Sequence, residues 1–173
     1  MVDVWDEIAG GAAEESSLWA DCLSAEPDRT AVFSPLGAAE HALGLETIYE
    51  GYLVHYGRSR LFAPPDDDTA LLLGDYLYAH GLVRIAAAHD VDSVADLSEL
   101  ISLCSQLRAE ERDGDGSLWA AAAALLGRRA LDGPFAALRL RSDPAPLDEA
   151  ARAAAGDAAV DAALAAHAEL RVR

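Results

Sequence analysis

Two consecutive segments decide the fold: LETIYEGYLVHYGRSRLF at residues 45–62 and TALLLGDYLYAHGLVRIAAAH at residues 69–89. In both, apolar residues recur at steps of three and four, which is the spacing of one face of an α-helix. A Ser-Pro pair can open the first helix, which we expect over residues 34–60. Two prolines and three aspartates mark a turn at residues 63–68. Because that turn is short, the two helices should be antiparallel neighbours.

Glycine recurs every seven residues in both segments. The positions are Gly37, Gly44 and Gly51 in the first segment and Gly74 and Gly81 in the second. A glycine inside a helix is about 1 kcal/mol less favourable than an alanine, so the repeat indicates a use in packing. Seven residues are close to two helical turns, which places the glycines nearly on one face. We therefore predict that the glycine-bearing faces lie in close helix–helix contacts, most simply with each other.

The rest of the chain also shows helical patterns, and no alternating pattern of a strand stands out. We expect helices over residues 2–24, 94–112, 117–131 and 147–170, and a short helical turn at 135–141. This predicts an all-α, single-domain antiparallel bundle of about six helices over residues 1–173. Its parts are an N-terminal helix in 1–30, core helices in 34–112 and C-terminal helices in 117–173.

Composition excludes several classes of partner. The 173 residues carry a net charge of −17, and all 13 basic residues are arginines. Nucleic acid is excluded because a phosphate-binding face needs clustered positive charge. No apolar run reaches the roughly 18–20 residues of a membrane span, and the acidic N-terminal sequence does not resemble a signal peptide. We therefore expect a cytoplasmic protein in which Cys22 and Cys104 are buried free thiols.

Residues 40–111 resemble the trans-type polyprenyl diphosphate synthases. In that family a helix ends in a segment like E-x-x-H-x-x-x-L-x-H-D-D-x-x-D, and the following helix begins L-x-G-D-x-L-x-x-x-A. Here ETIY and LVH, at 46–49 and 53–55, follow the first segment, and LLGDYLYA at 72–79 follows the second. ISLCSQLRAEE, at 101–111, stands where the family has its next helix. The resemblance implies a fold that is in part isoprenoid-synthase-like.

The chain departs from the family where the family's chemistry takes place. The first aspartate-rich motif of those enzymes binds magnesium ions that hold an allylic diphosphate. The matching positions here read YGRSR, at residues 56–60. A second aspartate-rich motif and lysines are also missing, and the chain is about half the usual length. The resemblance therefore implies a shortened, non-catalytic relative, for which we assign no catalytic residue, no metal and no cofactor.

A ligand site remains conceivable in the cleft between the helices at 35–60 and 69–89. Guanidinium groups suit phosphate, so Arg58 and Arg60 can contact a phosphate directly. The alternative is that both pair with surface carboxylates of this acidic chain. The candidate ligand-binding residues are Tyr49, Tyr52, His55, Arg58, Arg60, Asp75 and Tyr78.

Two other acidic motifs favour plain structure over a metal site. ERDGDGSLWAAA, at residues 111–122, resembles a calcium-binding EF-hand loop, but Ala122 stands where the bidentate carboxylate is required. We interpret it as an Asp-Gly turn. The three aspartates at 66–68 are expected to cap the following helix, with Asp68 as the capping residue.

Two functions stay open. The first is a non-catalytic, polyprenyl-synthase-like subunit or scaffold, present as a homo- or hetero-oligomer and possibly paired with a catalytic polyprenyl synthase. The second is a prenyl- or prenyl-phosphate-binding protein, or a metal-independent enzyme, that uses the cleft. A deep pocket beside His55 and Arg58 would favour the second function. A filled core with an apolar outer patch would favour the first, which we prefer.

Overall fold

A computed structural model describes residues 3–88 and 90–171. Those residues form an all-α fold, as predicted, and they contain no strand beyond an isolated bridge between Leu23 and Phe62. Two 3-10 turns, η1 (Ser34–Leu36) and η2 (Ala39–His41), precede the third helix. The helices are α1 (Val4–Glu15), α2 (Ser17–Asp21), α3 (Ala42–Tyr56), α4 (Asp67–Ala86), α5 (Val91–Ala109), α6 (Asp115–Leu125), α7 (Asp132–Arg141), α8 (Ala145–Ala155) and α9 (Asp157–Leu170).

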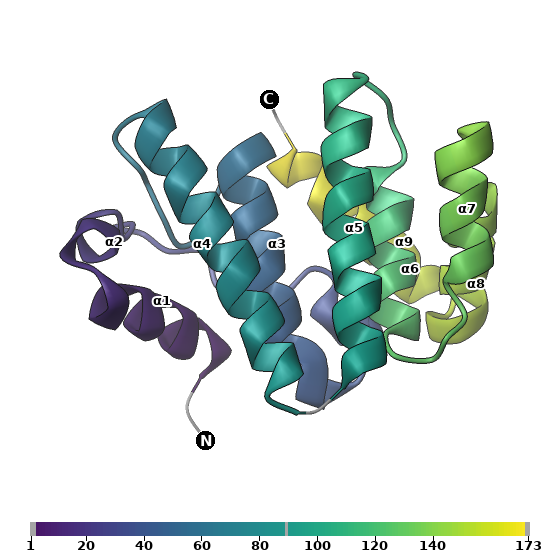
Figure 1. The fold of residues 1–173 in the computed structure, drawn as a ribbon, viewed down its shortest axis with the longest axis horizontal. Coiled ribbons are helices and arrows are strands. Elements are labelled where there is room, and N and C mark those ends of the chain that lie inside the picture. Colours follow the sequence, from purple (N-terminus) through teal and green to yellow (C-terminus); the bar gives the residue numbers. More distant parts are fainter. Residues whose placement is uncertain (1–2, 89, 172–173) are drawn as a thin grey trace.

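The helices form two groups: α1 and α4 pack against α3, and α5, α8 and α9 pack against α6. Figure 1 shows α1 and α2 at one end of the molecule and α7 and α8 at the other. Between them, α4 lies in front of α3, and α5 lies in front of α6 and α9. Helices α4 and α5 also contact each other, so together they form the front layer.

Helix α3 has no face turned to solvent along most of its length. Every residue from Gly44 to Val54 is buried, including two glutamates. Ile48, Tyr52 and Leu53 all belong to the main apolar core. Because α3 is surrounded, it lacks the one-sided apolar stripe of a surface helix.

The predicted glycine contacts are confirmed for four of the five glycines. A Cβ atom placed on Gly81 would lie 3.0 Å from the carbonyl oxygen of Gly44, and one placed on Gly51 would lie 3.0 Å from that of Gly74. Side chains at these positions would therefore hold α3 and α4 apart. Gly37 does not take part, because it lies before α3 and packs against the carbonyl of Ala123.

Replacing Gly81 with alanine tests this contact. The new methyl group would collide with Ile48 and press on the carbonyl of Gly44. Overpacking of this kind destabilises by roughly 1–3 kcal/mol, of which the better helix propensity of alanine offsets part. We expect the free energy of unfolding in urea to fall by about 1 kcal/mol. In the control, Gly10→Ala, no atom lies within 4 Å of the new methyl group, so stability should rise. Equal effects at both glycines would contradict the close contact.

Several predicted helix boundaries were wrong. The helix expected over 34–60 spans only Ala42–Tyr56, because the chain runs through two 3-10 turns and an extended Gly37 before it. The helix expected over 2–24 breaks at Ser16, whose hydroxyl accepts a hydrogen bond from Leu18 N and caps α2. The helix expected over 147–170 breaks at Gly156, where φ is +88°.

The remaining differences concern helix ends. Asp66, not Asp68, caps α4, since its Oδ1 accepts a hydrogen bond of 2.8 Å from Thr69 N. The helices expected over 94–112, 117–131 and 135–141 are α5, α6 and α7, each shifted by a few residues. With both terminal helices divided in two, and α7 longer than a turn, the described chain has nine helices where about six were expected. The predicted ends at Val2 and His89 lie outside the described residues.

Candidate functional site

The seven predicted ligand-binding residues lie in different environments. Helix α3 carries Tyr49, Tyr52 and His55, helix α4 carries Asp75 and Tyr78, and the segment after α3 carries Arg58 and Arg60. They do not line a common cleft, since α3 and α4 pack directly on each other through their glycines.

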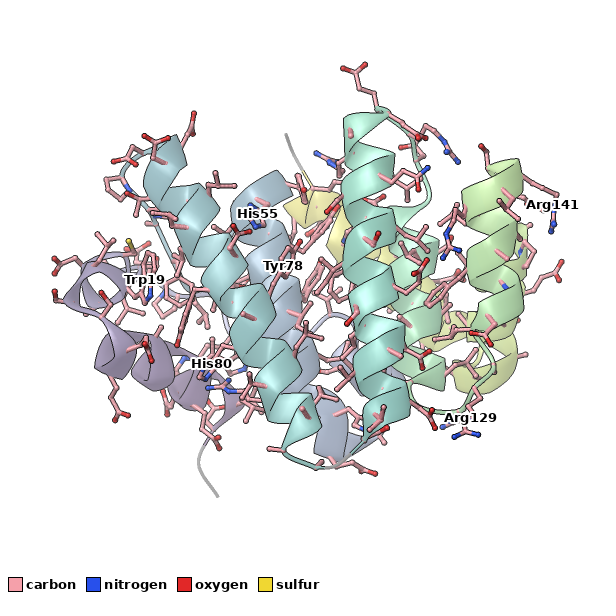
Figure 2. All side chains as sticks on the ribbon, in the orientation of Figure 1. Trp19, His55, Tyr78, His80, Arg129 and Arg141 are labelled. Carbon is pink, nitrogen blue, oxygen red and sulfur yellow. The ribbon has the colours of Figure 1, made fainter. Side chains whose placement is uncertain are left out.

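His55 occupies the space that Gly74 leaves free between α3 and α4. Its Nε2 lies 3.3 Å from Asp75 Oδ1, and its ring centroid lies 5.1 Å from that of Tyr78. Figure 2 shows His55 and Tyr78 close together where the two helices meet. Burial lowers the pKa of His55 and outweighs the opposing charge of Asp75. The uncharged imidazole therefore acts as a packed side chain that orients Asp75.

Arg60 is buried in an ion-pair network. Its Nε lies 3.0 Å from Glu50 Oε2, and its Nη1 lies 2.9 Å from Glu46 Oε2. The guanidinium also lies between the rings of Trp5 and Tyr49, at 4.8 and 4.9 Å from their centroids. Burial would lower the pKa of Arg60, but the two carboxylates raise it. Arg60 is therefore committed to the fold and does not present its charge to a phosphate from solvent.

Glu50 fixes the path of the chain after α3. Its Oε1 accepts hydrogen bonds of 2.8 Å from the backbone N–H groups of Arg60 and Leu61, and another from the hydroxyl of Ser59. The side chain of Glu50 is fully buried, with 0% of its surface exposed. The turn after α3 is thus anchored from inside by a glutamate of that helix.

A second buried polar cluster joins α3, α6 and α9. The hydroxyl of Tyr49 and Nδ1 of His167 share a hydrogen bond of 2.8 Å. The hydroxyl of Tyr52 donates to Asp115 Oδ2, which also lies 3.1 Å from Arg171 Nε and 3.6 Å from His167 Nε2. Burial raises the pKa of both tyrosines. Both hydroxyls therefore stay protonated and serve to tie three helices together.

Asp115 belongs to the acidic loop that resembles a calcium site, and its position shows what this residue does there. It opens α6 with its side chain turned into the core and only 1% exposed. Burial acts to raise the pKa of this carboxyl, but His167, the Tyr52 hydroxyl and the charge of Arg171 together lower it to about 2. Asp113, two residues earlier, is 92% exposed and pairs with Arg171. The guanidinium of Arg171 thus contacts both aspartates, so the chain itself supplies their cation.

One surface groove borders the predicted residues. Its volume is about 790 Å³, and it lies between the turn after α3, the start of α4 and the segment after α2. The exposed Arg58 and the buried Arg60 both line it, whereas His55 does not. Apolar side chains and carboxylates share the lining, among them Leu53, Val54, Phe62, Glu26, Asp28, Asp66 and Asp67.

The charges of this groove predict that it does not hold a diphosphate. Four carboxylates share the lining with Arg58 and Arg60, and the charge of Arg60 is already paired with Glu46 and Glu50. A highly charged anion would therefore meet net repulsion. Titration calorimetry with inorganic diphosphate should show no saturable heat at millimolar concentration. The Arg58→Ala variant should give the same trace. Saturable binding to the natural protein that this variant loses would contradict the prediction.

The sequence did not predict that Glu46, Glu50 and Asp115 would be buried in polar networks, although a signal was present for the first two. They are the only carboxylates of α3 and lie one turn apart in an otherwise uncharged helix. Such a pair on a helix of this kind indicates an inward-facing site for a cation. Nothing in the sequence indicated that Arg60 would be that cation.

No protein-family model, curated protein or solved structure matches this chain. The resemblance to polyprenyl diphosphate synthases therefore stays a prediction that rests on the residues quoted for it. Within residues 3–88 and 90–171, no helix combines the length and the apolar character needed to cross a bilayer.

Proposed function

We propose that this chain is a non-catalytic interaction protein that acts as a subunit or regulatory scaffold. The buried acidic side chains, which are of a kind that can act in catalysis, bind other side chains in the core. Glu46 and Glu50 pair with Arg60, and Asp115 accepts a hydrogen bond from Tyr52. A partner protein would instead bind at the surface. A cytoplasmic location belongs to the same proposal.

The observation that carries the proposal is an outer surface with almost no charge on α4 and α5. Beyond the first turn of each helix, the exposed residues of α4 and α5 include one charged group, Asp75. In the first turn of α5, the side chain of Asp92 is also 42% exposed, and it pairs with Arg129. We call this surface the α4–α5 face. It consists of Leu71, Leu72, Asp75, Ala79, Val83 and Ala86 on α4 and of Val91, Ala95, Ser98, Ser102 and Ala109 on α5.

This face contrasts with the rest of the molecule. The chain has 30 acidic residues, and α9, for example, exposes Asp157, Asp161 and Glu169. On α4, by comparison, Leu72 is 57% exposed and Val83 is 64% exposed. Depletion of charge with exposed aliphatic groups is typical of the centre of a protein–protein interface.

A catalytic polyprenyl synthase is the partner that the sequence resemblance supports. The α4 sequence LLGDYLYA, at 72–79, carries the most specific part of that resemblance and also contributes Leu72, Asp75 and Ala79 to the α4–α5 face. A relative that has kept this helix but has YGRSR in place of the magnesium-binding motif is suited to bind a synthase and unsuited to replace it.

Affinity capture from the native host tests this function. The natural chain, Ala79→Arg and Ala165→Arg would each be used as bait, and recovered proteins would be quantified by mass spectrometry. Both alanines are exposed on long helices, but Ala165 lies on α9, away from the α4–α5 face. We expect a polyprenyl synthase with the natural chain and with Ala165→Arg, and its loss with Ala79→Arg. Recovery of the natural chain alone, holding a lipid, would instead support the ligand-binding alternative.

A further inference from the structure

We infer that the groove beside the turn after α3 binds an extended basic peptide segment of a partner protein. Basic side chains of the peptide would lie on the rim, and an apolar side chain would lie on the floor. We call this surface the acidic groove, and its rim consists of the carboxylates Glu26, Asp28, Asp66 and Asp67. None of its lining residues belongs to the α4–α5 face, so the inference goes beyond the proposed function.

The fold does not use the rim carboxylates for ion pairs. Within residues 3–88 and 90–171, none of the four pairs with an arginine or a histidine. Asp66 accepts a hydrogen bond from Thr69 N, and Asp28 accepts one of 2.9 Å from Thr30 N. These bonds to neutral backbone groups leave the negative charges available to a cation from another molecule.

The two arginines of the lining do not balance the rim. The charge of Arg60 is already paired with Glu46 and Glu50, which leaves the exposed Arg58 against four carboxylates. The net charge of −17 on the whole chain adds a long-range attraction for a basic partner. Charge therefore selects a cationic occupant for this groove.

The rim charges are spread along the groove and do not converge on one point. Glu26 and Asp28 lie on the segment after α2, whereas Asp66 and Asp67 lie at the start of α4. In the part of the chain that the structure describes, no three His, Cys, Asp or Glu side chains lie close enough together to hold a metal ion. Carboxylates on two walls instead suit the separated positive charges of an elongated ligand. The volume of about 790 Å³ falls within the range of about 300–1,000 Å³ that is typical of ligand clefts.

The two walls of the groove are fixed to each other by backbone hydrogen bonds. Ser24 N donates to Leu61 O at 2.8 Å, and Ala63 N donates to Cys22 O at 2.7 Å. Glu50 holds the same stretch from inside, through the N–H group of Leu61. The groove is therefore formed before a ligand arrives, which lowers the entropic cost of binding.

The floor of the groove favours a peptide over a polyamine. Leu53, Val54 and Phe62 are buried apolar residues of the lining. Pro64 and Pro65 add apolar surface and have no N–H group to donate. A peptide can place an aliphatic side chain on this floor while its basic side chains reach the rim, whereas a linear polyamine has only methylene links between its charges. An apolar centre with a polar rim is typical of a protein interface.

Fluorescence anisotropy with a defined probe tests the rim. The probe is a labelled peptide of alternating arginine and leucine, added to the purified full chain. The double variant Glu26→Gln/Asp67→Asn should raise the Kd at least ~10-fold, because two unpaired rim charges are lost. The control Asp132→Asn/Glu149→Gln removes the same charge from α7 and α8, at the other end of the molecule (Figure 1). Like the test pair, it changes one first-turn aspartate and one exposed glutamate, and the Kd should change less than ~2-fold.

Two further measurements separate shape from charge. Ala63→Trp narrows the groove without changing its charge and should also raise the Kd about 10-fold, whereas Ala165→Trp on α9 should not. A peptide of alternating arginine and glycine should bind the natural chain at least ~10-fold more weakly, since it has no side chain to bury on the floor. Circular dichroism of every variant checks that the helices remain folded.

Four results would overturn the inference. The first is no saturable binding of the arginine–leucine probe. Equal weakening by the two double variants would mean that the probe follows the net charge of the chain and not the groove. An unchanged Kd in Ala63→Trp would place the probe elsewhere, and displacement of the probe by spermine at equal concentration would make the occupant a polyamine. Each of these results leaves the proposed function standing, because affinity capture with Ala79→Arg reports only on the α4–α5 face.

Discussion

The Arg60→Leu variant is expected to lose about 3–5 kcal/mol of its free energy of unfolding. The substitution keeps an apolar side chain but leaves Glu46 and Glu50 without their cation in the core. Removing one partner of a buried ion pair has effects of this size because the remaining charge is neither solvated nor compensated. Two carboxylates depend on this single arginine, so the upper part of the range is expected.

Equilibrium unfolding in urea, followed by circular dichroism, measures this loss. Arg128→Leu is the matched control, because Arg128 is exposed and its replacement should change stability by no more than about 0.5 kcal/mol. The loss of stability in Arg60→Lys should lie between those of Arg60→Leu and Arg128→Leu. An ammonium keeps the charge but cannot bind two carboxylates with the geometry of a guanidinium. A loss below about 1 kcal/mol in Arg60→Leu would show that the network is dispensable.

Acid should remove a contribution of about 2 kcal/mol that Asp115 makes to stability. The pKa of this carboxyl is lowered from 3.8 to about 2 in the folded chain, and each pKa unit corresponds to about 1.4 kcal/mol. Because the folded-state value is the lower one, the contribution is complete above about pH 4. It disappears as the pH falls toward 2, where the folded carboxyl also takes up its proton.

The comparison of natural chain and Asp115→Asn isolates this carboxyl from the other acidic groups. The stability difference between the two proteins should be largest at pH 5 and should shrink by about 2 kcal/mol at pH 2. Asp113→Asn, at a position 92% exposed, should show no such pH-dependent difference. A difference for Asp115→Asn that stays constant from pH 5 to pH 2 would mean that its carboxylate has no special stabilisation.

The helical fold could be predicted because the periodic burial of apolar side chains determines where the helices form. The spacing of apolar residues located most of the helices, and the glycines at seven-residue steps correctly predicted the close pairing of α3 with α4. The breaks at Ser16 and Gly156 were missed because apolar periodicity continues across both. At these two places a side-chain cap and a positive φ determine the chain's path, and periodicity does not report either.

The environment of the candidate site could not be predicted to the same extent. On a helix that is buried on all sides, no polar face shows which tyrosines point outward, and Tyr49 and Tyr52 proved to lie in the core. The sequence suggested that Arg60 would contact phosphate or pair with surface carboxylates. Its burial was missed because it depends on two glutamates that lie ten and fourteen positions earlier in the chain. Arg58, by contrast, is exposed, and the local sequence alone does not distinguish these neighbouring arginines.

The bond between Tyr49 and His167 also bears on how the protein folds. The two residues are 118 positions apart, and His167 is as buried as the core it completes. Until α9 docks, the hydroxyl of Tyr49 lacks His167 as its partner, and the carboxylate of Asp115 has the hydroxyl of Tyr52 but not His167 or Arg171. Such non-local contacts slow folding and are made late. When α3 and α4 have emerged from the ribosome, the polar side chains of this helical hairpin therefore still lack their partners on α9. Cooperative folding is complete only after α9 has been synthesised and has docked.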